Sequence, residues 1–419
     1  MERNRPWSGG GETGFVEQSV SWKGSGGVRV VSSTGVVLGC EVLREDPPSW
    51  FRSARLGLLS NQASVTGSFE HTRSIIDRAG GRLVCLFSPQ HGFFSEKQAN
   101  MVESSDFRME SLPVHSLYGT VRQPSPEMLH SIDVLLVDLQ DVGTRVYTFG
   151  VTLGLCMETA AQTGTKIVVL DRPNPIGGHR AEGNLLREEC RSFVGRYPIP
   201  MRHGLTLGEL ALFIQTQCKV SCDLEIVRMK GWRRGDYFPD TRLPWVFPSP
   251  NMPTWETALL YPGMVLLEGC NISEGRGTTL PFRLFGAPFI QQKRLGEYLQ
   301  DLKPEGVVFR PACFEPMFDK WRGKVCYGFQ VHVTDRESFR PYRLGLCLLC
   351  GFLTVCRGDF QWLPPPYEYE WEKLPVDILL GDRSIREGLE AGTDVDEIEK
   401  DWTAELERYK ETVRACHLY

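Results

Sequence analysis

The sequence lacks several features that would assign it to large classes of protein. It has no run of about eighteen apolar residues, so no membrane span is expected. Its first fifteen residues contain no apolar stretch of the kind found in a secretory signal. The formal net charge is −5, which argues against a basic face for binding nucleic acid. We therefore predict a cytoplasmic protein without a membrane span or a nucleic-acid partner.

Motifs for cofactors, metals and common nucleophiles are also missing. No GxGxxG follows the first predicted strand, and no GxxxxGK[ST] or GxSxG occurs. Cys347 and Cys350 have CxxC spacing, but they lie in an apolar run and have no second pair at zinc spacing. The eight histidines form no HExxH pattern. The prediction is therefore no cofactor and no metal.

The thirteen cysteines are scattered along the chain and form no framework of regular spacings. Such usage is typical of a reducing compartment, in which cysteine acts as a small core residue. This supports the cytoplasmic prediction.

The length of 419 residues exceeds that of one typical core and favours two domains. Residues 1–34 are rich in glycine, serine and polar residues and are predicted to form a disordered leader. Residues 35–245 are predicted to form the first domain. Residues 231–254, which are rich in proline, tryptophan and arginine, are predicted to form an ordered, irregular connection across this boundary, and residues 246–419 are predicted to form a smaller α+β domain that closes a cleft.

Strand and helix patterns alternate through the first domain. Short apolar runs predict strands at Arg55–Leu59, Leu83–Phe87, Ile132–Val137, Lys166–Leu170 and Leu224–Met229. Apolar periodicity predicts helices at Glu70–Ala79, Thr148–Gln162 and Thr206–Gln217. This alternation is typical of right-handed βαβ units, so the predicted fold class is α/β, with a Rossmann-like parallel sheet covered by helices.

A polar loop directly follows each of the first four predicted strands. These loops are residues 60–62, 89–92, 138–145 and 171–178. In an open parallel sheet the carboxyl ends of the strands share one edge, and ligands bind there. The four loops therefore predict a binding site at this edge.

Carboxylates are the reactive groups that remain as candidates. Glycoside hydrolysis needs a carboxylic acid to protonate the leaving oxygen and a second group to stabilise the oxocarbenium-like centre. The acids near the predicted edge or in the second domain are Glu96, Glu103, Asp138, Asp141, Asp171, Glu182 and Glu274. Each has an alternative role as a loop brace or a solvated charge. Arg145, Arg172 and Arg276 are expected either to pair with these acids or to clamp a substrate carboxylate.

Several long runs of this sequence resemble one known family. SPQHGF, PVHSLYG, IDVLLVDLQDVGTRVYT, VVLDRPNPIGG, LPWVFPSPNMPT and EGCNISEGRGTTLPF are similar to segments of the DUF1343 family. That family includes the exo-β-N-acetylmuramidases of peptidoglycan recycling, glycoside hydrolase family 171. The resemblance implies a Rossmann-like domain, a smaller second domain and an active cleft between them. It also implies release of N-acetylmuramic acid from the non-reducing end of cell-wall fragments.

One position departs from the family pattern. The loop that usually reads PEHG, with its glutamate as the catalytic acid, contains Gln90 here. An amide cannot donate an acid proton at neutral pH, so we expect Glu103 or Glu96 to supply the proton instead. Glu182 or Glu274 is expected to be the partner. The alternative hypothesis is a non-catalytic carbohydrate-binding homologue that lost its acid at this position.

The resemblance also implies a set of substrate-binding residues. They are Gln90, His91, Asp138, Asp141, Arg145, Tyr147, Asp171, Arg172, Asn174, Arg202, His203, Asn251 and Arg276. The sugar, the linkage, the stereochemical outcome and the oligomeric state stay open at the level of the sequence.

Overall fold

The computed structural model describes residues 35–98 and 101–419. The predicted leader, 1–34, lies outside the described residues. Residues 35–419 form one compact unit. In the described part of the chain, every helix is too short or too polar to cross a bilayer. All thirteen cysteines lie in this part, and each is a free thiol.

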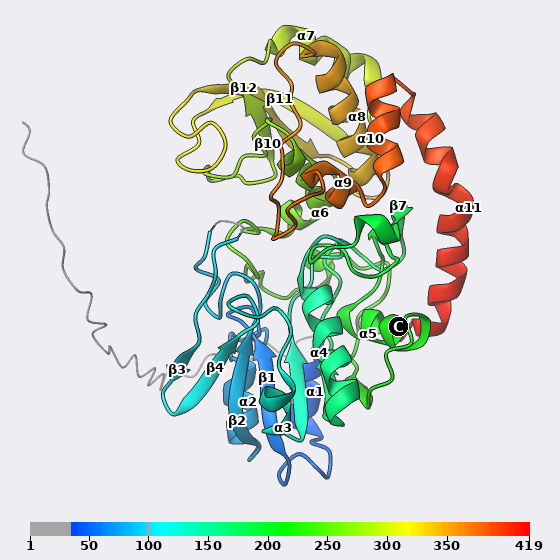
Figure 1. The fold of residues 1–419 in the computed structure, drawn as a ribbon. Helices are drawn as coiled ribbons and strands as arrows, with labels where there is room; N and C mark the ends of the chain where they lie inside the picture. Colours follow the sequence, from blue (N-terminus) through cyan, green and yellow to red (C-terminus); the bar gives the residue numbers. More distant parts are fainter. Residues whose placement is uncertain (1–34, 99–100) are drawn as a thin grey trace, which may run out of the picture. The chain divides into compact units, whose positions relative to one another are not determined.

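A seven-stranded sheet dominates the first half of the unit (Figure 1). Its strands, in spatial order, are β3 (Phe107–Met109), β4 (Leu112–Ser116), β2 (Arg82–Ser88), β1 (Arg55–Ser60), β5 (Val134–Asp138), β6 (Lys166–Leu170) and β9 (Leu224–Val227). All neighbours pair in parallel except β3 and β4. This confirms the predicted α/β class, and the β3–β4 hairpin at one edge is an addition that the apolar-run pattern did not predict.

Helices cover both faces of this sheet. The helices of this half are α1 (Gly39–Glu45), α2 (Thr72–Arg78), α3 (Pro126–His130), α4 (Phe149–Thr163) and α5 (Leu207–Gln217). Apolar residues of α1 and α2 share one core with one sheet face, and those of α3, α4 and α5 share a second core with the other face. The central strand β5 is therefore buried along its whole length, as parallel strands covered on both sides are.

The second half builds around a three-stranded antiparallel sheet. Its order is β10 (Leu284–Ala287), β12 (Cys326–Val333) and β11 (Val307–Phe314). The surrounding helices are α6 (Trp255–Met264), α7 (Gln292–Leu302), α8 (Pro341–Val355), α9 (Pro375–Leu380), α10 (Arg383–Ala391) and α11 (Val395–Val413). A small ladder of β7 (Glu182–Leu185) and β8 (Pro200–Arg202) lies earlier in the chain.

The larger core continues from the seven-stranded sheet into the second half. It contains Leu135 of β5, Leu260 of α6, Leu348 of α8 and Trp402 of α11. Figure 1 shows α11 running past β7 towards α5. A shared core explains why residues 35–419 form one unit, and the division at residue 245 stays a prediction.

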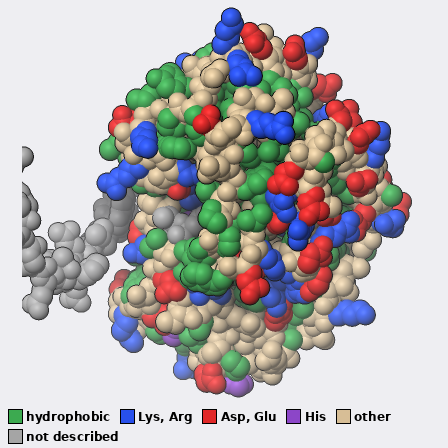
Figure 2. All heavy atoms as spheres, turned by 45° about the horizontal axis from the view of Figure 1, so that its top comes forward, with side chains coloured by type: hydrophobic (Ala, Val, Ile, Leu, Met, Phe, Trp, Pro, Cys, Tyr) green, Lys and Arg blue, Asp and Glu red, His purple; other side chains and the backbone are tan. Residues whose placement is uncertain are grey.

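Charged side chains of both signs are interspersed over the face shown in Figure 2, without a large patch of one sign. This distribution agrees with the small formal net charge of −5.

Arg145 links the carboxyl edge of the large sheet to the second half of the unit by hydrogen bonds. Its guanidinium donates to the carbonyl oxygens of Asn184 (2.8 Å), Ile199 (3.2 Å), Leu379 (3.1 Å) and Leu380 (2.7 Å). The last two carbonyls belong to the C-terminal end of α9, where a positive charge is favourable. The arginine is 3% exposed, so its charge is committed to the backbone.

We predict that Arg145→Met lowers the free energy of unfolding by about 3 kcal/mol or more, because buried carbonyls lose their donors. Arg145→Lys should recover little of this loss, since a lysine ammonium cannot reproduce the planar fork. Urea unfolding of the three proteins tests this, and an Arg145→Lys variant as stable as wild type would contradict it.

Candidate active site

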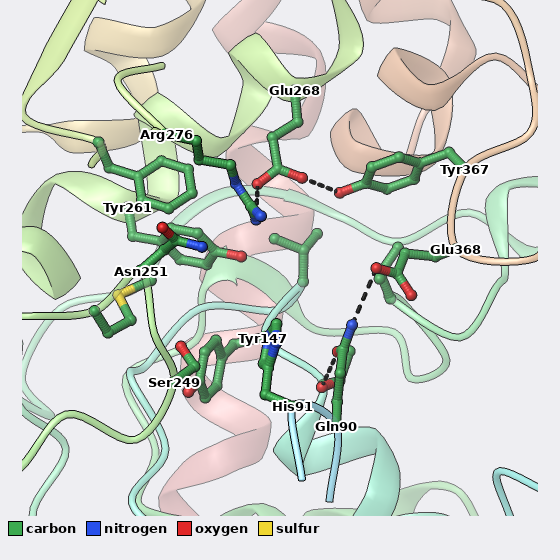
Figure 3. Close-up of a pocket in the computed structure, with 15 residues that line it drawn as sticks. Gln90, His91, Tyr147, Ser249, Asn251, Tyr261, Glu268, Arg276, Tyr367 and Glu368 are labelled. Atoms are coloured by element: carbon green, nitrogen blue, oxygen red, sulfur yellow. Dashed lines mark hydrogen bonds and ion pairs between the residues drawn. The ribbon is translucent and has the colours of Figure 1, made fainter. Parts of the chain in front are cut away.

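One pocket collects side chains from both halves of the unit (Figure 3). The loop after β2 supplies Gln90 and His91, and the approach to α4 supplies Tyr147 and Thr148. The second half supplies the remaining polar groups, which are Ser249, Asn251, Tyr261, Glu268, Arg276, Tyr367 and Glu368. The hollow has a volume of about 420 Å³, its open mouth included.

A tight β-turn carries Glu368 into this pocket. The backbone of Tyr367 and that of Glu370 exchange two hydrogen bonds of 2.9 Å. The two residues between them, Glu368 and Tyr369, have φ values of 48° and 65°. Two successive positive φ values are typical of a type I′ hairpin turn, which glycine and asparagine usually occupy. Side chains that adopt this conformation cost on the order of 1 kcal/mol or more each, and such strain is found where function requires it.

Glu368 is held by one donor on each carboxylate oxygen. Gln90 Nε2 donates to Oε1 at 3.0 Å, and the Tyr118 hydroxyl donates to Oε2 at 2.5 Å. The side chain is 3% exposed. Burial raises the pKa of Glu368 to about 7, and the negative charge of Glu268 adds to this, although both hydrogen bonds act in the opposite direction.

Glu268 lies in an environment that favours its ionised form. Its carboxylate accepts from Arg276 Nη2 at 2.7 Å and from the Tyr367 hydroxyl at 2.6 Å. Burial alone would raise its pKa, but the Arg276 charge and the Tyr367 hydrogen bond hold the pKa of Glu268 below its usual value. The pocket thus contains one ionised carboxylate and one that is protonated for much of the time near neutral pH.

His91 is a neutral acceptor in the same pocket. Burial lowers its pKa to about 4. Its Nδ1 lies 2.7 Å from the carbonyl oxygen of Lys97, which can only accept, so Nδ1 carries the hydrogen. Nε2 of the neutral ring is therefore left with its lone pair.

Comparisons with known proteins agree on one family. Residues 56–256 match the family model described as exo-beta-N-acetylmuramidase NamZ, N-terminal, and residues 259–419 match the corresponding C-terminal model. The chain is 42% identical over 386 residues to the peptidoglycan beta-N-acetylmuramidase NamZ of Bacillus subtilis (strain 168), covering 92% of this chain and 91% of that protein. This chain belongs to the NamZ family. It is an exo-acting glycoside hydrolase, which confirms the family and enzyme class expected from the sequence motifs.

Two solved structures show the same fold. Both are crystal structures of DUF1343 family proteins from Bacteroides fragilis NCTC 9343. One has a TM-score of 0.83 at 32% identity, covering 92% of this chain and 100% of that chain. The other has a TM-score of 0.73 at 28% identity, covering 92% and 99%. The NamZ family fold thus extends over nearly all of the described residues.

Part of the substrate-binding set predicted from the sequence meets in the pocket. Gln90, His91, Tyr147, Asn251 and Arg276 all line it. The remaining members lie outside the lining and make internal contacts instead. They are Asp138, Asp141, Arg145, Asp171, Arg172, Asn174, Arg202 and His203.

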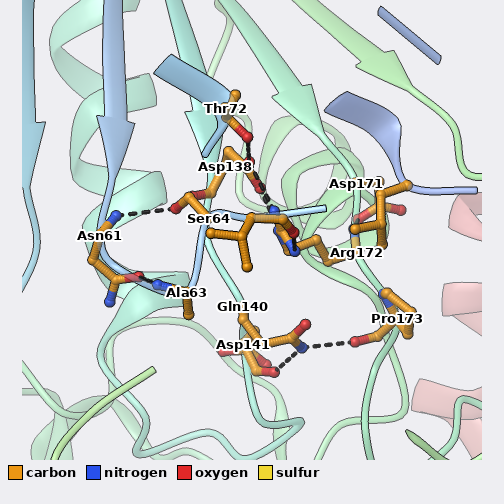
Figure 4. Close-up of polar contacts among 12 residues, drawn as sticks. Asn61, Ala63, Ser64, Thr72, Asp138, Gln140, Asp141, Asp171, Arg172 and Pro173 are labelled. Atoms are coloured by element: carbon orange, nitrogen blue, oxygen red, sulfur yellow. Dashed lines mark hydrogen bonds and ion pairs between the residues drawn. The ribbon is translucent and has the colours of Figure 1, made fainter. Parts of the chain in front are cut away.

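The polar residues at the carboxyl edge of the large sheet mainly bind one another (Figure 4). Asp138 pairs with Arg172, whose Nη2 lies 2.9 Å from Oδ2, and also accepts from the Thr72 hydroxyl. Asp171 accepts from the Gly208 amide (2.9 Å) at the start of α5 and from the Tyr419 hydroxyl (2.8 Å). These two aspartates therefore brace loops and a helix N-terminus.

The other edge residues have similar internal partners. Asp141 accepts from the Gly143 amide at 2.7 Å and lies 3.3 Å from His203 Nε2. Asn174 donates to the Leu205 carbonyl at 2.9 Å, and Arg202 donates to the carbonyl of Ile176. Roles in binding substrate stay untested predictions for these residues.

None of the four carboxylates predicted to be catalytic lines the pocket. The side chains of Glu96 and Glu103 are 49% and 50% exposed, and Glu103 contacts Arg122 at 3.4 Å. Glu182 is buried in β7 and accepts from the Arg343 amide at 2.9 Å. Glu274 is buried behind the pocket, 3.4 Å from Arg276 and 2.5 Å from Lys320.

The sequence interpretation missed both carboxylates of the pocket. Glu268 opens the run EGCNISEGRG, which was noticed only for Glu274 and Arg276. Glu368 gave no signal, because its turn contains no glycine and it lies 278 positions from Gln90.

Among the described residues, no cluster of three or more His, Cys, Asp or Glu side chains is arranged to hold a metal.

The raised pKa of Glu368 makes a prediction about stability. A carboxyl with a raised pKa in the folded state stabilises the fold at low pH, and this contribution is lost as pH rises through about 7. Glu368→Gln lacks this titration. As pH rises from 5 to 8, we therefore expect the free energy of unfolding of Glu368→Gln to increase relative to that of wild type, by up to about 3 kcal/mol.

Urea unfolding at several pH values measures this difference. Glu103→Gln is the control, because it makes the same change at an exposed carboxylate. A difference between Glu368→Gln and wild type that is constant from pH 5 to pH 8 would contradict the prediction.

Proposed function

We propose that this NamZ family member releases N-acetylmuramic acid from the non-reducing end of peptidoglycan-derived fragments. The observation that carries the proposal is a pair of buried carboxyl groups in one pocket, Glu268 paired with Arg276 and Glu368 held by two neutral donors, which lowers the pKa of the first and leaves that of the second raised. Two carboxyl groups whose environments separate their pKa values in this way are the usual acid and anion of a glycosidase.

Glu368 is the general acid of the proposed mechanism. It gives its proton to the glycosidic oxygen while the bond from that oxygen to the anomeric carbon breaks, so the shortened saccharide leaves as an alcohol. Glu268, ionised beside Arg276, stabilises the positive charge that develops on the sugar ring. Water then adds to the anomeric carbon. The proton that this water loses returns to Glu368, so the acid is regenerated.

The remaining walls of the pocket suit an amino sugar. Of the three arginines expected from the sequence to pair with acids or to clamp substrate, Arg276 lines the pocket and pairs there with Glu268, whereas Arg145 and Arg172 bind parts of the protein outside it. His91 Nε2 accepts a hydrogen bond from a sugar hydroxyl, because the neutral ring offers a lone pair there. Tyr147 and Tyr261 provide ring faces and edges for the apolar side of the sugar.

The thirteen free thiols support a reducing compartment, and hence the cytoplasmic location predicted from the sequence. Recycling of fragments already taken into the cell agrees with that location.

Hydrolysis of para-nitrophenyl β-N-acetylmuramide tests the proposed function, with the β-N-acetylglucosaminide as control. We expect wild type to release nitrophenol from the muramide and much less from the control, since only the muramide has the lactyl carboxylate. Binding of the muramide without turnover would contradict the proposal and favour the alternative hypothesis of a carbohydrate-binding homologue that has lost its acid.

Replacement of the proposed acid should depend on the leaving group. Glu368→Gln should lower kcat/KM for a muramyl disaccharide by about 10²- to 10⁴-fold, because the sugar alcohol needs a proton to leave. The loss should be much smaller with a dinitrophenyl muramide, whose leaving group departs without protonation. Glu96→Gln and Glu103→Gln are the matched controls for the acids predicted from the sequence. Equal losses by Glu368→Gln on both substrates would contradict the acid assignment.

A further inference from the structure

We propose that Gln90 is a positioning residue for Glu368, and that its amide leaves the pair with one exchangeable carboxyl proton, located on Glu368. This inference rests on the proposed function, since it concerns the proton donor of that reaction. It gives the amide at position 90 a role of its own.

The amide of Gln90 is oriented by a partner on each side. The Thr148 hydroxyl donates to Gln90 Oε1 at 2.7 Å, and Gln90 Nε2 donates to Glu368 Oε1 at 3.0 Å. Once Glu368 has given up its proton, a flipped amide would set two acceptor oxygens, Gln90 Oε1 and Glu368 Oε1, against each other. Thr148 is the N-cap residue of α4, but its hydroxyl makes no capping bond and is available to Gln90. The Thr148 hydroxyl at the N-terminus of α4 therefore helps to orient the Gln90 amide.

The second donor is directed in the same way. The Tyr118 oxygen accepts from the Met101 amide at 3.1 Å, and its hydroxyl hydrogen goes to Glu368 Oε2 at 2.5 Å. Gln90 follows β2, and Tyr118 follows β4, so two neighbouring strands of the large sheet hold the carboxylate. These two hydrogen bonds offset part of the conformational strain at Glu368, whose φ is 48°.

The two donors also suit the chemistry of proton release. A carboxyl group that gives up its proton becomes an anion, and hydrogen bonds to each oxygen stabilise that anion. Each oxygen keeps a second lone pair, which can carry the transferable proton towards the pocket. An amide at position 90 donates to Glu368 without competing for its proton.

A carboxyl group at position 90 would behave differently. At 3.0 Å two carboxylates cannot both ionise, so the pair would share one proton and titrate as a unit. The other titratable or charged side chains that interact with Glu368 are Tyr118, Tyr261, Glu268, Arg276, Tyr367 and Tyr369. Gln90 is neutral at every pH. Within the Gln90–Glu368 pair, Glu368 is therefore the residue that titrates.

The test combines pH–rate profiles with a double-mutant cycle on the full chain, using the muramyl disaccharide. Gln90→Met keeps the length of the side chain and removes the donor, and we expect kcat to fall about 10- to 100-fold with KM little changed. Thr148→Val should lower kcat less, by about 3- to 10-fold, and should cost less than about twofold when Gln90 is already Met. Gln90→Glu should move the alkaline limb of kcat upward by about one pH unit or more.

These outcomes separate a positioning role from a purely structural one. Unchanged kcat in Gln90→Met would overturn the inference. So would a full effect of Thr148→Val in the Gln90→Met background, or an unshifted alkaline limb in Gln90→Glu. Unfolding midpoints at pH 5 confirm that each variant is folded.

A second measurement needs no substrate and keeps the inference separate from the proposed function. The loss of stability with rising pH should extend to higher pH in Gln90→Glu than in wild type, because the shared proton is released later. Identical pH dependence in the two proteins would overturn the inference. If wild type hydrolyses no glycoside but this shift is seen, the proposed function fails and the Gln90–Glu368 pairing stands.

Discussion

The site depends on two carboxyl groups buried in one pocket, of which Glu268 pairs with an arginine and Glu368 is held by neutral donors. Glu268 has Arg276 within 2.7 Å and a tyrosine hydroxyl at 2.6 Å, which compensate for the loss of hydration. The hydrogen bonds to the Glu368 oxygens come from two neutral donors, Gln90 and Tyr118, and the anionic Glu268 is nearby. A second buried anion under these conditions is costly, so Glu368 retains its proton to a higher pH. This difference in surroundings is why we assign the acid role to Glu368 and the anion role to Glu268.

The rest of the fold maintains that arrangement. The Asp138–Arg172 pair, the helix-bracing Asp171 and the carbonyl-binding Arg145 satisfy polar groups at the carboxyl edge of the sheet. These contacts fix the loops that follow β5 and β6, beside the pocket. The second half of the unit delivers Glu268 and Glu368 from the opposite side, and the shared core keeps the two halves together. A strained turn at Glu368 is stable in this setting because its side chain is held at both oxygens.

Local sequence patterns were sufficient for five of the seven strands of the large sheet and for the loops that follow them. The apolar runs at β1, β2, β5 and β6 predicted the parallel sheet, and the loop after β2 contains Gln90 and His91 as expected. Chemical type alone did not separate pocket residues from braces, because Asp138 and Glu268 are both buried acids beside an arginine. Glu368 was out of reach for a different reason. Its turn conformation is imposed by tertiary contacts and not by glycine, and its partners lie in another half of the chain.

The central claim is that Glu368 holds a proton near neutral pH, and carbon NMR of protein labelled at the glutamate side-chain carboxyl tests it most directly. We predict a carboxyl resonance that titrates near pH 7 in wild type and is absent from Glu368→Gln, since burial and Glu268 raise the pKa of this group to about 7. The account would be contradicted if the resonance assigned to Glu368 titrated near pH 4, as an ordinary glutamate does.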